Sequence, residues 1–143
     1  MKLFSVFALS YCLLLSAQAQ NWPSFRGPKA AGVSDLNPLP TTWDGEKSVN
    51  LRWKTLIPGL AHSSPIVWGN RIFLTTAISS NKQFTYVPKD RGIDLANDNV
   101  PHSWRMYCLD KDSGRILWER VAHEGVPRVK RHIKASQANA TPV

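Results

Sequence analysis

The chain has 143 residues and a formal net charge of +8, with 18 Lys and Arg against 10 Asp and Glu. This length favours a single domain. Of the two cysteines, only Cys108 lies outside the N-terminal segment that we expect to be removed. One thiol cannot form an intrachain bridge, so a disulfide-stapled scaffold is excluded. Because Cys108 sits in an apolar stretch, we expect it to be a buried and inert thiol.

Residues 1–19 have the pattern of a secretory signal. Lys2 gives the positive start, residues 3–15 form a mostly apolar run, and Ala17-Gln18-Ala19 offers a cleavage site with small residues. The run is shorter than the roughly 20 residues that a membrane-spanning helix needs, so a membrane anchor is the less favoured alternative. We therefore expect cleavage after Ala19, export to a periplasmic or extracellular location, and no transmembrane anchor after cleavage.

Residues 20–45 form an irregular lead-in that is rich in Pro, Gly and polar residues. Its Trp22-Pro23 and Asn37-Pro38-Leu39-Pro40 segments disfavour helix and favour extended or turn conformations. All six tryptophans of the chain lie in the segment that follows the signal. This density of rigid aromatic side chains suggests a repeated packing device.

After the lead-in, the sequence predicts strands and no helix of useful length. Residues 51–56 (LRWKTL) alternate apolar and polar side chains with period two, as a strand with one buried face does. Gly69-Asn70 joins two β-rich runs, which is a strong hairpin signal, and Asp112-Ser113-Gly114 supplies a further turn. The fold class is therefore all-β, with strands expected at 51–56, 64–68, 71–77, 104–110 and 115–122.

Two long insertions interrupt the strands, at 78–103 and 123–139. Connections of this length in a compact domain are functional loops or partly disordered segments. Acidic and amide side chains gather between Asp94 and Asn99 in the first insertion. A calcium site is one interpretation of this group, and a solvated insertion is the favoured one.

The chain also resembles itself. Residues 51–55 (LRWKT) align with 116–120 (ILWER), and residues 62–67 (HSSPIV) align with 139–143 (NATPV). The offsets between the copies differ, as loop insertions into a shared unit would make them. With the inserts removed, the unit approaches the roughly 40–45 residues of a four-stranded propeller blade.

Residues 108–118 (CLDKDSGRILW) carry a family resemblance. They look like the tryptophan-docking repeat of the pyrroloquinoline-quinone (PQQ)-like β-propellers, with Cys108 in place of the usual alanine. The side chains of this turn can bond its backbone, its glycine can take the left-handed conformation, and its tryptophan can pack against an adjacent blade. The residues that match the repeat are Asp110, Ser113, Gly114, Arg115 and Trp118.

Two further segments, 22–34 and 126–132, resemble a bacterial exported subgroup of the same family. The resemblance implies a β-propeller of about eight four-stranded blades, of which this chain would be an N-terminal fragment. Residues 46–143 would then be a first-blade region with its two insertions, truncated within the next blade. The segment 51–56 would belong to the blade that closes the propeller.

The most prominent candidate surface is a basic run in the second insertion. An anion-binding loop for a phosphorylated, carboxylated or polysaccharide ligand is one interpretation, and a solvated loop is the favoured alternative. Export disfavours nucleic acid as the ligand. The residues of this candidate loop are Arg128, Lys130, Arg131, His132 and Lys134.

No catalytic, cofactor-binding or metal-binding residue can be assigned from the sequence. The four histidines lack the spacing of a zinc site. By the resemblance, an enzyme of the wider superfamily would use PQQ, calcium, a base aspartate and commonly a disulfide of adjacent cysteines. This chain has no adjacent cysteines and no aspartate that can be matched to the base, so PQQ and calcium remain implied by the resemblance only.

The leading hypothesis is therefore an exported, non-enzymatic β-propeller that acts as a binding or scaffold protein of the cell envelope. Its partner would be an envelope protein or an anionic ligand such as a polysaccharide. The alternative is a PQQ-dependent dehydrogenase whose active site lies in blades outside this chain. A propeller fold by itself does not decide between the two.

Overall fold

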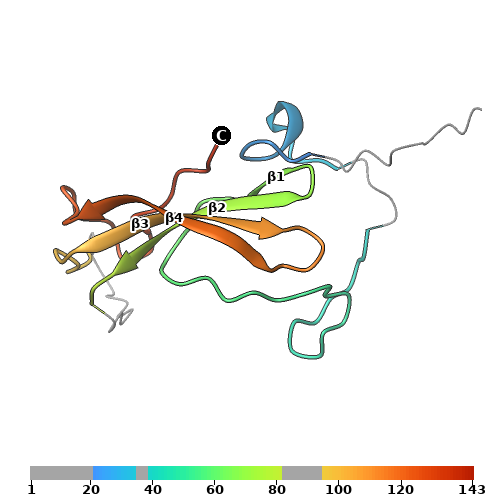
Figure 1. Cartoon of the computed structure of the whole chain (residues 1–143), viewed down its shortest axis with the longest axis horizontal. Helices are drawn as coiled ribbons and strands as arrows, with labels where there is room; N and C mark the ends of the chain where they lie inside the picture. Colours follow the sequence, from blue (N-terminus) through green and yellow to red (C-terminus); the bar gives the residue numbers. More distant parts are fainter. Residues whose placement is uncertain (1–20, 35–38, 82–94) are drawn as a thin grey trace, which may run out of the picture.

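The computed structural model describes residues 21–34, 39–81 and 95–143. The expected signal segment, 1–19, lies outside these residues. The described chain folds into one four-stranded antiparallel sheet in the order β1-β2-β3-β4, so each strand pairs with the next along the chain (Figure 1). Its strands are β1 (Ile66–Trp68), β2 (Arg71–Ser79), β3 (His102–Asp110) and β4 (Ile116–Gly125).

The all-β prediction is confirmed. The only helical element in the described residues is a short 3-10 turn, η1 (Pro28–Ala30), and none of their helices has the length and apolar character needed to cross a membrane. The lead-in segment also contributes to the sheet edge, because Trp22 and Val67 of β1 exchange two backbone hydrogen bonds of 2.8 and 2.9 Å.

The two tight turns lie at the same end of the sheet. Gly69, in the β1–β2 turn, has a φ of 57°, as the Gly-Asn hairpin signal predicts. Residues 111–115 form the β3–β4 turn, and both turns lie on the right in Figure 1. The long connections, which correspond to the two insertions, leave from the opposite end. These insertions are shorter than predicted, because β2, β3 and β4 extend into them.

The core is centred on β3. Tyr107, Cys108 and Leu109 are 1–2% exposed, and Thr76 of the neighbouring β2 is equally buried. Cys108 is buried, which confirms the expectation of a buried thiol, and this burial raises the pKa of the thiol. Burial also raises the pKa of Tyr107, and the neighbouring Glu119 carboxylate raises it further.

The predicted strand at 51–56 is wrong in one respect: it pairs with no strand of the described chain. Its side chains do alternate between half-buried and exposed positions, as the period-two pattern predicts. The segment runs instead past the β3–β4 turn, to which the side chains of Arg52, Trp53 and Thr55 donate hydrogen bonds.

Candidate functional site

The β3–β4 turn has the internal bonding that its sequence predicts. The Oδ1 atom of Asp110 accepts hydrogen bonds from the Ser113 hydroxyl (2.7 Å), the Ser113 amide (2.9 Å) and the Asp112 amide (3.2 Å). The bonds from Ser113 are the main reason that the pKa of Asp110 is lowered. Gly114 follows with a φ of 69°, the left-handed region that glycine adopts without a steric penalty.

The indole of Trp53 docks onto this turn from another part of the chain. Its Nε1 donates to the Lys111 carbonyl oxygen at 2.9 Å. The ring lies so close to Gly114 that a Cβ there would come within 2.4 Å of it. Thr55 adds a bond from its hydroxyl to the Gly114 carbonyl oxygen at 2.7 Å. Only glycine therefore fits at this position, for steric as well as conformational reasons.

The repeat's own tryptophan, Trp118, lies on β4 in a half-buried position. Its ring centroid is 6.0 Å from that of Phe73. The guanidinium carbon of Arg120 also lies 6.0 Å from the Trp118 ring centroid. The remaining matched residue, Arg115, is exposed beside the turn. The structure thus assembles the turn residues of the repeat, whereas Trp118 lies apart from the turn.

The basic loop residues lie at the far end of the sheet, and Arg131 differs from the others. Its side chain is buried, and its Nε donates to Asp98 Oδ2 at 2.6 Å. Its Nη1 donates to the carbonyl oxygen of Ala135 at 2.7 Å and to that of Ile133 at 3.2 Å. Arg131 therefore holds the loop from inside, and its guanidinium is not part of the exposed surface.

The same contact joins the two insertions. Leu95 and His132 form an isolated antiparallel bridge, and the Ala96 amide donates to the Arg131 carbonyl oxygen at 2.9 Å. Asp98 also lies 3.9 Å from Nε2 of the buried His102, whose Nδ1 donates to a backbone carbonyl. A buried ion pair thus links two segments that are 33 residues apart.

Further hydrogen bonds fix the backbone of the loop. The Gln137 side chain donates to the Val129 carbonyl oxygen at 3.2 Å, and the Lys134 amide donates to His132 Nδ1 at 3.1 Å. These bonds hold the loop at Val129 and between Arg131 and Lys134. We call residues 95–97 together with 126–134 the basic tip. Its exposed basic side chains are Arg128, Lys130, His132 and Lys134.

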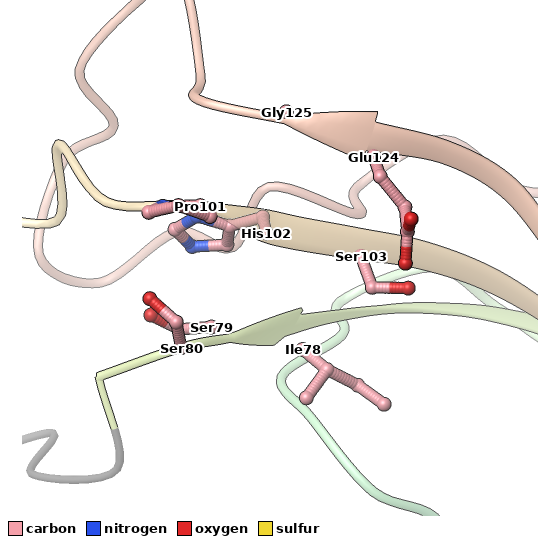
Figure 2. Close-up of a pocket in the computed structure, with 8 residues that line it drawn as sticks. All are labelled: Ile78, Ser79, Ser80, Pro101, His102, Ser103, Glu124 and Gly125. Atoms are coloured by element: carbon pink, nitrogen blue, oxygen red, sulfur yellow. The ribbon is translucent and has the colours of Figure 1, made fainter.

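A depression of about 350 Å³ opens beside the basic tip, where the strands end (Figure 2). The Glu124 side chain points toward Ser103 on the neighbouring strand, and the His102 ring lies between the start of β3 and the end of β2. The depression is open and carries a single carboxylate. Its lining residues are Ile78, Ser79, Ser80, Pro101, His102, Ser103, Glu124 and Gly125.

Within residues 21–34, 39–81 and 95–143, no group of three or more His, Cys, Asp and Glu side chains is placed to hold a metal ion. Asp94, one member of the acidic cluster noted above, lies outside these residues, and Asp98 is occupied by Arg131.

Comparison with known proteins does not place the chain. No family model, no curated protein and no solved structure matches it.

The Asp98–Arg131 pair was not predicted from the sequence. The acidic cluster in one insertion and the basic run in the other were a signal from which it could have been found.

Proposed function

We propose that this chain is part of an exported, non-enzymatic β-propeller of the cell envelope that binds an anionic ligand through its basic tip. The PQQ-like repeat turn supports the architecture, because Asp110, Gly114 and the docked Trp53 form a joint between separate segments. The four-stranded antiparallel sheet has the strand number and order that a propeller blade requires.

The observation that carries the binding proposal is that the Arg131 guanidinium is buried and bonded within the loop. Burying a guanidinium is costly unless it is paired and hydrogen-bonded, and here it binds a carboxylate and loop carbonyls. This internal clamp fixes the backbone that carries Arg128, Lys130 and Lys134, and a preorganised site loses less entropy on binding.

The test uses the full-length protein and dextran sulfate as a soluble polyanion, with the affinity measured by calorimetry. The triple variant Arg128→Ala, Lys130→Ala, Lys134→Ala should bind about tenfold more weakly or worse, because fewer counterions are released. A charge-matched control, Lys29→Ala, Lys54→Ala, Arg115→Ala, removes three exposed cations from elsewhere. If the two variants lose the same amount of affinity for dextran sulfate, a specific site at the basic tip would be refuted.

The same preparation separates binding from catalysis. We expect the full-length protein, supplied with PQQ and calcium, to bind no quinone tightly and to oxidise no simple alcohol. A micromolar or tighter affinity for PQQ, together with alcohol turnover, would instead establish the dehydrogenase.

A further inference from the structure

The basic tip exposes apolar side chains among its cations. Val129 stands between Arg128 and Lys130 and is 76% exposed, and Val126 is 48% exposed. Leu95, on the other insertion, is 54% exposed and bridges to His132. The segments 95–97 and 126–134 meet at the Leu95–His132 bridge, at the end of the sheet away from its two tight turns (Figure 1). Exposed apolar and basic side chains therefore occur in the same part of the chain's surface.

These exposures follow from the bonding of the loop. The Val129 carbonyl is held by Gln137, and the adjacent turn is held by the buried Arg131. Single exposed apolar residues are common on protein surfaces and need no explanation. Val129 differs from such scattered residues, because it lies between Arg128 and Lys130 on a backbone that is held in place by hydrogen bonds. The fold therefore keeps an apolar side chain in water beside two cations.

We propose that the basic tip docks the protein on the surface of an anionic lipid bilayer. The proposal rests on the anion-binding function above and names its ligand. Arg128, Lys130 and Lys134 would meet the lipid phosphates, while Val129 and Leu95 enter the boundary between headgroups and acyl chains. A soluble polysaccharide offers phosphate or carboxylate charge but no apolar layer for these two side chains to enter.

The expected strength is that of a reversible peripheral contact. Each basic residue near an anionic bilayer surface raises the affinity about fivefold, and the attraction decays within a Debye length. Three such residues with two small apolar side chains give binding that salt reverses. The described residues contain no helix long enough to cross a membrane, so the tip would bind at the surface.

The experiment is co-sedimentation of the full-length protein with phosphatidylcholine vesicles, prepared with and without phosphatidylglycerol. We expect binding only to the anionic vesicles and its loss in the Arg128→Ala, Lys130→Ala, Lys134→Ala variant. The pair Leu95→Ser, Val129→Ser should lower vesicle binding about tenfold and should lower the affinity for dextran sulfate, which has no apolar layer, by a much smaller factor. The matched control is Leu39→Ser, Val33→Ser, at a leucine that is 54% exposed and a valine that is 64% exposed outside the basic tip.

The outcomes separate the two proposals. Binding of dextran sulfate without binding of anionic vesicles would overturn the bilayer proposal and leave the anion-binding function standing. An unchanged vesicle affinity in the Leu95→Ser, Val129→Ser variant would also overturn it, because it would show a purely electrostatic contact. Failure to bind either probe would overturn both.

Discussion

The indole Nε1 of Trp53 donates a hydrogen bond to the Lys111 carbonyl oxygen, at 2.9 Å and across 58 residues of sequence. This bond ties the segment before the sheet to the turn between its last two strands. The same turn is stabilised internally by Asp110, so one short motif carries both local and long-range contacts.

Trp53→Phe keeps an aromatic ring at the turn and removes the hydrogen bond. We expect the free energy of unfolding of the full-length protein to fall by about 1 kcal/mol, measured by denaturant titration. Trp43→Phe is the matched control, because Trp43 is 77% exposed, and it should change little. Equal effects at the two positions would show that the docking contributes nothing.

Gly114→Ala and Gly69→Ala separate steric from conformational effects at two glycines with positive φ. At Gly69 nothing lies within 4 Å of the added Cβ, so only the left-handed conformation costs about 1–2 kcal/mol. At Gly114 the Cβ also meets the Trp53 ring, so the loss should be larger by about 1–3 kcal/mol. The denaturation midpoints of the two variants measure this difference in stability. Similar midpoints for Gly114→Ala and Gly69→Ala would contradict the packing of Trp53 on the turn.

Ser113→Ala tests the bonding of Asp110 through its pH dependence. The pKa of Asp110 is lower in the folded chain, so its stabilisation is present above about pH 4 and is lost as the pH falls through the folded-state value. Wild type should exceed the variant in stability at neutral pH, and the gap should narrow in acid. If the stability difference between wild type and variant stays constant down to a pH at which Asp110 is fully protonated, this linkage would be ruled out.

Asp98→Asn removes the carboxylate that pairs with the buried Arg131 guanidinium at 2.6 Å. Breaking a buried pair costs about 3–5 kcal/mol, and here the loss should fall on the basic tip. Hydrogen exchange should therefore accelerate at the Ala96 amide, which donates to the Arg131 carbonyl oxygen. Asp112→Asn, in an exposed pair with Arg52, is the control and should cost less than about 1 kcal/mol. Unchanged exchange at Ala96 in the Asp98 variant would contradict the clamp.

Local sequence was sufficient for the turns and for the all-β class. The bonds of Asp110, the φ of Gly114 and the hairpin at Gly69 depend on neighbouring residues, so a short window contains their causes. Period-two alternation at 51–56 reported a half-buried face but not a pairing partner, because burial against a turn gives the same pattern as burial in a sheet.

The organisation of the basic tip could not be predicted in the same way. Arg131 and its four basic neighbours are chemically alike in the sequence, and only the approach of Asp98 from another insertion makes one of them internal. That approach depends on where β3 begins and where β4 ends. The sequence shows a basic run, but it does not show that Arg131 is buried while Arg128 and Lys130 are exposed.

The most direct test of the basic tip is hydrogen exchange of the full-length protein with and without dextran sulfate. We expect added protection in peptides that cover residues 126–134 and 95–97, and none at the β3–β4 turn at the opposite end of the sheet. Protection at residues 111–115 instead, or no change at the tip under conditions where the polyanion is bound, would contradict the account.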